Sequence, residues 1–408
     1  MWRLAVPMLV CVAARAQDVG LEPDALQLAK IKLHMMDTLR RQPNYTCLET
    51  VERSHRDAST RKYRLEDTLR LEVALVDGKE MFAWPGSKQF EDKDIRTLVP
   101  TGTFGTGDFA LHARALFGGN SAIFQARGQQ DLEGRAALRF DFRVPRPVSG
   151  YQIRIPEFQT IVGYHGSFYV DPSSLDLRQL EIAGDDLPPE LKLKSLSDRM
   201  DYARARIGDA DFLLPESSEV VLVDLNGQEN RNRLKFTSCH QFTGQSVLSF
   251  EDLDPSAASA PVQKIELELP PDLELTLSLL DSINAQTAAI GDPVRAQLRN
   301  DLKVKGRVLL GKGAEASGRV SRLERHENFT IMGLIFTDLE SPSTHVKLDL
   351  QFDRFVGFDT LPPNRRLALA APPMPHEALV PLRSGGVRVM RGSLIFWRTT
   401  SADSSGAR

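Results

Sequence analysis

The stretch Tyr63-Arg-Leu-Glu-Asp-Thr-Leu-Arg-Leu-Glu-Val-Ala-Leu75 decides the fold class of this chain. Apolar side chains occupy nearly every odd position, while charged or polar side chains occupy the even positions from Arg64 to Glu72. A period of two is typical of a β-strand with one face in the core and one in water. Asp67 interrupts the apolar side and predicts a bulge or a sheet edge there.

The same alternation recurs along the chain and predicts a sheet of many strands. Leu138, Phe140, Phe142 and Val144 repeat it against charged neighbours. Glycine, proline and asparagine punctuate the runs as turns. Further strands are expected at residues 45–54, 79–84, 121–127, 160–170, 175–183, 199–207, 218–225 and 231–241, with turns at Gly78, Gly134, Asp171-Pro172 and Asn226-Gly227.

Two helices are expected among these strands. Residues 21–41 place Leu28, Ile31, Met35 and Leu39 on one face, which predicts an amphipathic helix packed on the sheet. A second helix is expected at 108–117, after the glycine-rich stretch 101–107. Such a stretch can cradle an anion, but it lacks the Lys-Ser/Thr pair of a phosphate-binding loop. A mobile loop or the start of a helix is the preferred interpretation.

The N-terminus has the organisation of a signal peptide. Arg3 supplies a positive charge, Leu4–Ala14 form a short apolar run, and Ala14-Arg15-Ala16 fits a cleavage site before Gln17. The run is too short for a permanent membrane helix, although a retained N-terminal anchor is the alternative. Cys11 is not preceded by the small residues of a lipoprotein signal. We therefore expect residues 1–16 to be removed and the protein to be periplasmic, outer-membrane associated or secreted.

Composition after cleavage favours a soluble protein of two domains. The mature chain of roughly 390 residues has 49 basic and 54 acidic residues, a net charge near −5. This balance gives no broad positive field, so nucleic acid is not an expected partner. No later stretch is apolar and long enough for a transmembrane helix.

Two cysteines, Cys47 and Cys239, remain in the mature chain. They lie near the first and the last strand of the expected first domain, and the compartment is oxidising. We predict that they form a disulfide. The alternative is two unrelated buried thiols.

A change of composition divides the chain. Residues 251–263, rich in Ser, Ala, Pro and acids, predict a linker between a first domain at 17–250 and an all-β domain at 264–400. Alternation resumes there in the runs 265–279 and 346–352, and Leu394–Trp397 form a last apolar strand. Residues 401–408 are expected to be a disordered tail.

No motif for catalysis or for cofactor binding is present. The eight histidines, which show neither the i, i+4 pairs of a helical zinc site nor finger spacing, are interpreted as surface or core residues. No nucleophile elbow appears, and carboxylates fall mainly on polar strand faces. We therefore predict no enzyme, no metal and no cofactor, although carboxylates converging in space would leave a hydrolase open.

Aromatic residues of the first domain suggest a binding surface. Phe140, Phe142, Phe158, Phe168 and Tyr169 fall on successive expected strands, as do Tyr151 and Tyr164. If the first five share one concave face, they form a site for a lipid or an acyl chain. The alternative is an ordinary core closed by the two helices, with Leu28, Met35 and Leu116 occupying the space of a ligand.

The stretch Gly166-Ser-Phe-Tyr-Val-Asp-Pro-Ser-Ser174 with Leu177-Arg-Gln-Leu-Glu181, continued by Tyr202–Asp211 and Leu214-Pro215, resembles the lipoprotein-carrier superfamily of LolA/LolB-like proteins, which includes RseB/MucB-type sensors. An apolar strand meets a DP turn before a second strand, and the expected order of elements also matches. The resemblance implies a half-open antiparallel β-barrel that holds acyl chains or lipoproteins.

The second domain resembles the C-terminal β domain of TrbI-type conjugation and secretion channel proteins. The matching residues are Asp281-Ser-Ile-Asn284, Ile290-Gly-Asp-Pro-Val-Arg-Ala296, Gly306-Arg-Val-Leu-Leu-Gly-Lys-Gly-Ala314 and Gly318-Arg-Val320. Gly311 replaces the usual proline of that family. The resemblance covers about 60 residues and implies strands joined by tight glycine turns.

The expected fold class is therefore α+β: a half-open antiparallel barrel with helices, then a β sandwich or small barrel. The expected function is binding of a lipidic, lipoprotein or protein partner in the cell envelope. The alternatives are a structural envelope-assembly protein without a small ligand and a secreted hydrolase with an unrecognised carboxylate site.

Overall fold

The structure is a computed structural model that describes residues 23–87, 90, 95–99, 102, 103, 105, 107–155, 158–242, 264–326, 328–356, 369, 372–383 and 388–400. The signal peptide (1–16), the linker (251–263) and the C-terminal tail (401–408) were predicted from sequence and lie outside these residues. Within the described part, no helix has the length and apolar character needed to cross a membrane.

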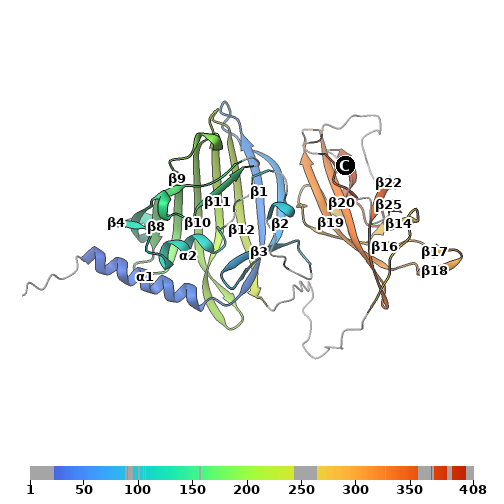
Figure 1. Cartoon of the computed structure of the whole chain (residues 1–408), viewed down its shortest axis with the longest axis horizontal. Helices are drawn as coiled ribbons and strands as arrows, with labels where there is room; N and C mark the ends of the chain where they lie inside the picture. The colour runs from blue at the N-terminus through green and yellow to red at the C-terminus, as the bar shows by residue number, and fades with distance from the viewer. Residues whose placement is uncertain are drawn as a thin grey trace, which may run out of the picture.

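The first sheet contains ten strands in the order β3-β2-β1-β12-β11-β10-β9-β8-β5-β4. It curls around the two α-helices, which lie on one of its faces (Figure 1). Each strand expected before residue 242 has a counterpart in it, although the strand expected at 160–170 lies only partly in this sheet. The bounds are β1 Tyr45–Arg56, β2 Arg64–Val76, β3 Lys79–Ala83, β4 Ile123–Leu132, β5 Arg135–Val144, β8 Gly163–Val170, β9 Leu177–Asp185, β10 Leu193–Ile207, β11 Ala210–Asp224 and β12 Glu229–Gln241.

The first strand of this sheet pairs with the last. β1 and β12 run antiparallel, with Val51 opposite Leu234. Cys47 and Cys239 form a disulfide across the pair, with Cα atoms 4.1 Å apart and a separation of 192 positions in sequence. The predicted bridge is confirmed, and it closes almost the whole first domain into one covalent loop.

Asp67 lies at a bulge, as its position in the alternation predicted. The register between β1 and β2 shifts between Arg53 and Ser54, so that Arg53 stands opposite Asp67 and Ser54 opposite Leu65. The Arg53 guanidinium forms an ion pair with the Asp67 carboxylate on the helix-covered face. The buried arginine explains why an acid is tolerated among apolar side chains.

The helices pack on this same face, called the inner face below. α1 (Pro23–Arg41) buries Ile31, Met35 and Leu39 against the sheet, because these residues recur at helical spacing. α2 (Leu111–Gly118) buries Ala113, Leu116 and Phe117. Three short 3₁₀ turns complete the helical structure: η1 Ile95–Thr97, η2 Arg146–Val148 and η3 Pro189–Leu191.

A separate hairpin interrupts the expected strand order. β6 (Gln152–Ile155) and β7 (Phe158–Ile161) pair with each other and with neither neighbour in the large sheet. They pack with Val162, Leu191 and Leu196 in a small apolar cluster of their own. The single strand expected at 160–170 is therefore two strands, because β8 begins only at Gly163.

The second sheet has nine strands, in the order β13-β21-β20-β19-β16-β14-β25-β22 with β23 on β20. The run 346–352 does not form one strand, because Val346 belongs to β21 and Leu350 to β22, which pair with different neighbours. Two further pairs, β15 with β24 and β17 with β18, form separate two-stranded sheets. The bounds of all these strands are β13 Ile265–Glu266, β14 Glu274–Leu279, β15 Ile283–Asn284, β16 Pro293–Leu298, β17 Leu302–Val304, β18 Arg307–Leu310, β19 Glu315–Arg325, β20 Phe329–Glu340, β21 Thr344–Lys347, β22 Leu350–Val356, β23 Ala378–Arg383, β24 Arg388–Val389 and β25 Leu394–Thr399.

The second sheet meets the first through one short segment. Ile290 forms a parallel bridge with Leu69 of β2, in the part of β2 that β3 does not cover. The Ile290 amide donates to the Thr68 carbonyl and the Arg70 amide to the Ile290 carbonyl, both at 2.7 Å. Ile290 packs against the apolar cores of both sheets. The segment before β16 thus satisfies backbone groups on an otherwise open strand edge.

Side chains reinforce this contact. Arg70 forms an ion pair with Asp292, and the Arg319 guanidinium lies 4.8 Å from the ring centroid of Trp84. Gly291 has a φ of +101°, and a Cβ there would lie 2.2 Å from the Arg70 carbonyl oxygen. The close approach of the two backbones therefore requires glycine at this position.

Loss of the disulfide is expected to destabilise the first domain. The chain-entropy model gives about 5 kcal/mol for a loop of this length, and native disulfides typically contribute roughly 2–5 kcal/mol. Urea unfolding of the oxidised chain, followed by intrinsic fluorescence, should show a lower midpoint when a reductant is added. The Cys47→Ser/Cys239→Ser variant is the control and should match the reduced wild type with or without reductant. Equal midpoints for oxidised and reduced wild type would contradict the prediction.

Substitution of Gly291 is expected to separate the two sheets. Gly291→Ala places a methyl group against the Arg70 carbonyl, so the bridge at Ile290 cannot form unchanged. Small-angle X-ray scattering should then report a larger radius of gyration. Gly306→Ala is the matched control, since Gly306 also has a positive φ, of +80°, but open space around its Cβ position. Equal radii for the two variants would show that the contact tolerates the methyl group.

Candidate functional site

Three of the five aromatic residues predicted to bind a ligand come together on the inner face. Phe140 and Phe142 of β5 and Phe168 of β8 belong to one buried cluster. The rings of Phe140 and Phe168 are stacked, with centroids 5.3 Å apart and an interplanar angle of 7°. Phe117 of α2 meets Phe168 edge-on at 5.1 Å. An aromatic stack therefore lies directly beneath the helices.

The other two predicted residues lie elsewhere. Tyr169 stands opposite Arg139 in the β5–β8 pair and therefore on the outer face, because successive residues of a strand point to opposite sides. Phe158 belongs to β7 and packs in the cluster of the small hairpin. Only Phe140, Phe142 and Phe168 share the face that the prediction assigned to all five.

The inner face is filled by the helices in this structure. Met35 of α1 and Leu116 of α2 are buried in the cluster that contains Phe140 and Phe168, and Leu28 packs against it. This is the alternative that the sequence left open, in which the helices occupy the space of a ligand. An acyl chain would have to displace one of them.

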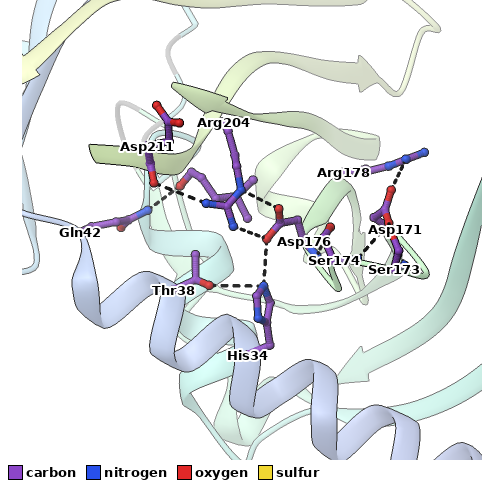
Figure 2. A network of polar contacts seen from close by, with 11 residues as sticks. His34, Thr38, Gln42, Asp171, Ser173, Ser174, Asp176, Arg178, Arg204 and Asp211 are labelled. Carbon is purple, nitrogen blue, oxygen red and sulfur yellow. Dashed lines mark hydrogen bonds and ion pairs between the residues drawn. The ribbon is translucent and has the colours of Figure 1, made fainter. Parts of the chain in front are cut away.

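α1 is held to the sheet by a polar latch, which comprises His34, Asp176 and Arg204 (Figure 2). His34 Nε2 lies 2.9 Å from Asp176 Oδ1. Arg204 of β10 donates to both oxygens of the same carboxylate at 2.8 Å. Burial acts to raise the pKa of Asp176, but the bonds from Arg204 and His34 outweigh it and lower the pKa. The carboxylate is thereby kept ionised for the latch.

The turn between β8 and β9 positions Asp176. Asp171 accepts hydrogen bonds from the Ser173 hydroxyl and from the amides of Ser173 and Ser174, and it forms an ion pair with Arg178. These bonds hold the pKa of Asp171 well below its ordinary value. The Asp171-Pro172 turn, singled out in the sequence, therefore builds a rigid platform for α1.

A second group of polar residues is buried where α2 begins, and we call it the acidic cluster: Asp108, His112, Asp198 and Ser218. His112 Nε2 lies 3.4 Å from Asp108 Oδ1 and 3.7 Å from Asp198 Oδ2. The Ser218 hydroxyl lies 2.8 Å from Asp108 Oδ2 and 3.0 Å from Asp198 Oδ1. Asp108 and Asp198 are 3% and 2% exposed. The three titratable side chains have the composition of a metal-ligand set.

The two carboxylates of this cluster titrate in opposite directions. Burial and the neighbouring Asp108 carboxylate raise the pKa of Asp198 well above its ordinary value. Burial also opposes ionisation of Asp108, but the neighbouring His112 and the Ser218 hydroxyl contribute to an overall lowering of its pKa. Like charges at this distance in a dry site do not ionise together without a compensating cation.

Two further buried carboxylates surround the acidic cluster. Glu80 of β3 accepts hydrogen bonds from the amides of Gly107, at 2.7 Å, and Ala110, at 2.9 Å. The Glu80 carboxyl group thereby occupies the backbone amides at the start of α2. These are the donors with which the glycine-rich stretch could otherwise have bound a phosphate. Burial and the nearby Asp108 raise the pKa of Glu49 well above its ordinary value. The region is strongly acidic for a protein interior.

The acidic cluster does not have the geometry of a serine hydrolase. Among the described residues Ser218 hydrogen-bonds to two aspartates and to no histidine, which is the general base of a Ser-His-Asp triad. Ser218 is also buried, at 4% exposure. These residues therefore do not form a serine-hydrolase site, and the carboxylate-site hydrolase is a separate alternative that stays a prediction.

A hollow of about 550 Å³ lies on the outer face of the same sheet. A cross-strand row of Asp141, Ser167, Glu181, Arg199 and Glu219 runs through it, one residue from each of five neighbouring strands. Charged and hydroxyl groups of this kind suit polar partners and disfavour an acyl chain.

Sequence reasoning missed the acidic cluster, although one signal was present. Asp108 and His112 are four residues apart at the predicted start of a helix, which places them on one face. The expectation of no metal site was based on the absence of histidine pairs at this spacing, which leaves out a histidine paired with an aspartate. Asp198 and Ser218 lie 90 and 110 residues from Asp108 and are joined to it only by strand order, which the sequence did not specify.

Comparisons with known proteins give weak structural similarities. No protein-family model and no curated protein matches the chain. Among solved structures, a domain described as an outer membrane lipoprotein-sorting protein from Vibrio parahaemolyticus has 11% identity and a TM-score of 0.31, over 53% of this chain and 93% of that one. A DUF1329 family protein from Desulfovibrio piger has 9% identity and a TM-score of 0.31, over 53% and 92%. The lipoprotein LppX of Mycobacterium tuberculosis has 9% identity and a TM-score of 0.21, over 53% and 97%. With TM-scores this low, the argument on function rests on the residues of the chain itself.

Glu49 is expected to make stability depend on pH. Because its pKa is raised in the folded state, the folded chain binds a proton that the unfolded chain releases above its ordinary pKa of 4.5. The side chain therefore destabilises the fold increasingly as the pH rises above that value. Glu49→Gln removes this effect, so its stability relative to wild type should increase from pH 4 to pH 7 in urea unfolding. Glu52→Gln, an exposed change on the same strand, is the control and should show no comparable trend. A Glu49→Gln difference that is constant between the two pH values would contradict the prediction.

Proposed function

We propose that this chain is a non-catalytic binding protein of the cell envelope that takes an acyl chain of a lipid or lipoprotein between α1 and the inner face. The observation that carries the proposal is the aromatic stack of Phe140, Phe168 and Phe117 directly beneath an N-terminal helix. That helix is attached by a narrow apolar stripe and a polar latch. In this proposal α1 is the lid, and the surface beneath it is the binding site.

The free energy needed to displace α1 and the free energy gained by burying an acyl chain are comparable in size. α1 buries three side chains completely or nearly so, Ile31, Met35 and Leu39. Each contributes about 1.5–3 kcal/mol, so exposing all three costs roughly 5–9 kcal/mol. An acyl chain of about 16 carbons gains about 12 kcal/mol at 0.8 kcal/mol per buried methylene. A single long chain can therefore offset the displacement of α1, while a short one cannot.

An oxidising compartment such as the periplasm agrees with this proposal. A disulfide between Cys47 and Cys239 persists in oxidising compartments, which agrees with an exported chain. An acyl chain in the periplasm needs a protein to shield it from water during transfer. Export itself, by cleavage after Ala16, is part of the proposal.

For the second domain we infer a supporting function. Residues 264–400 are proposed to fold as a unit separate from residues 17–250, joined by the linker 251–263. The contact at Ile290 covers the free part of β2 and keeps that edge from pairing with other chains. A relation to the β domain of TrbI-type channel proteins remains a proposal for the strands around residues 281–320.

Locking α1 tests whether the helix is a lid. His34→Cys and Asp176→Cys place two thiols across the latch, and a short bis-maleimide joins them, since the native cysteines are bridged. Wild type should bind a fluorescent 16-carbon fatty acid saturably, with one site per chain. The double variant should bind before crosslinking and lose at least about tenfold in affinity afterwards, because the ligand space no longer opens.

Controls separate a specific site from surface adsorption. Wild type treated with the same crosslinker should keep its affinity. Phe168→Glu should abolish binding, whereas Tyr169→Glu, the neighbouring residue on the outer face, should not. The proposal fails if wild type shows no saturable binding, or if the crosslinked variant binds as well as the open one.

A further inference from the structure

We propose that Asp108, His112 and Asp198 form a binding site for a divalent transition-metal cation such as Zn²⁺. The three residues come from the start of α2 and from β10, so the ion would join the helix to the sheet. This site is separate from the acyl-chain site proposed above and does not depend on it.

The spacing of the ligand atoms fits a metal better than it fits hydrogen bonds. Metal–ligand bonds of about 2.0–2.2 Å place the atoms of a tetrahedral site roughly 3.3–3.6 Å apart. His112 Nε2 lies 3.4 Å from Asp108 Oδ1 and 3.7 Å from Asp198 Oδ2. Both distances exceed the range of about 2.7–3.2 Å for an N–H···O hydrogen bond. One imidazole nitrogen thus faces one carboxylate oxygen within the range of a tetrahedral site and a second oxygen about 0.1 Å beyond it.

The hydrogen bonding of the acidic cluster is incomplete when both aspartates are ionised. The Ser218 hydroxyl has one proton but faces an oxygen of each aspartate, at 2.8 and 3.0 Å, so it can donate to only one of them. The other oxygen of Asp198, Oδ2, is buried and accepts no hydrogen bond from the described residues. A buried carboxylate oxygen without a partner is costly, and a cation at this point would satisfy it.

The chemistry of the ligands selects the class of ion. Two carboxylates and one imidazole suit Zn²⁺, Mn²⁺ and Fe²⁺, whereas Ca²⁺ and Mg²⁺ prefer oxygen ligands alone. Two ionised aspartates neutralise the charge of a divalent ion. Three protein ligands leave a fourth position of a tetrahedral ion for water or for the Ser218 hydroxyl.

The backbone at Gly107 makes room for the imidazole. Gly107 has a φ of +103°, and a Cβ there would lie 2.9 Å from His112 Nε2. The ring also lies against Tyr151, with centroids 5.3 Å apart. The position of His112 is therefore fixed by both the glycine and the aromatic ring, as a preorganised ligand requires.

Titration with metal alone tests the site in the full mature chain. After treatment with EDTA and its removal, ZnCl₂ should bind with a stoichiometry of one in calorimetry. Co²⁺ should give the intense visible absorption of a four-coordinate ion. Asp198→Asn and His112→Gln should each lower the Zn²⁺ affinity by more than about 100-fold. This exceeds the roughly 10–100-fold loss expected for a residue that only orients a ligand.

Matched variants on the outer face control for nonspecific binding. Asp141→Asn and His165→Gln change the same residue types at exposed ion pairs and should leave the Zn²⁺ affinity unchanged. Circular dichroism shows whether each variant is folded. The Co²⁺ spectrum of wild type needs no substitution, so it tests the site independently of how the variants fold. The proposal is overturned if wild type binds neither ion stoichiometrically, which would mean that the two aspartates share a proton instead. It is also overturned if the inner-face variants bind Zn²⁺ as tightly as the outer-face controls. Either result leaves fatty-acid binding unaffected and testable.

Discussion

The antiparallel pairing of β1 with β12 is the contact on which the rest of the first domain depends. It places the start and the end of the domain side by side in the sheet, so that β2 and β3 extend it on one side and β11 to β4 on the other. The pairing joins residues almost 200 positions apart, and contacts of this range form slowly because they close a long loop. Every later feature, including the free part of β2 and the inner face that receives the helices, follows from this strand order.

Strand positions were largely predictable from the sequence, because alternation depends only on local burial. The run from Tyr63 to Leu75 and the bulge at Asp67 are examples. Which residues share a site was less predictable. Phe168 and Tyr169 were assigned to one surface, but neighbours in a strand must face opposite ways. Phe158 was misplaced because nothing in the pattern revealed the small hairpin that carries it away from the sheet.

The acidic cluster and the contact at Ile290 were beyond the sequence for a different reason. Each depends on residues that are distant in the chain and that meet only after the strands have paired. Asp108 and His112 show a local spacing, but Asp198 reaches them through the order of β9, β10 and β11. In the sequence, Ile290 is an ordinary apolar residue next to a glycine. Its pairing with the uncovered part of β2 is apparent only in the folded chain.

The disulfide between Cys47 and Cys239 also determines how the chain carries mechanical load. Tension applied to the two ends of the chain passes along α1 into the beginning of β1, crosses the sulfur atoms, and leaves through the end of β12. The 191 residues between the cysteines lie outside this path, so stretching the oxidised protein cannot extend their sheet. Among the described elements, α1 and those that follow β12 then bear the load. In the reduced protein the same tension would act on the β1–β12 hydrogen bonds, so the redox state decides whether the sheet bears force.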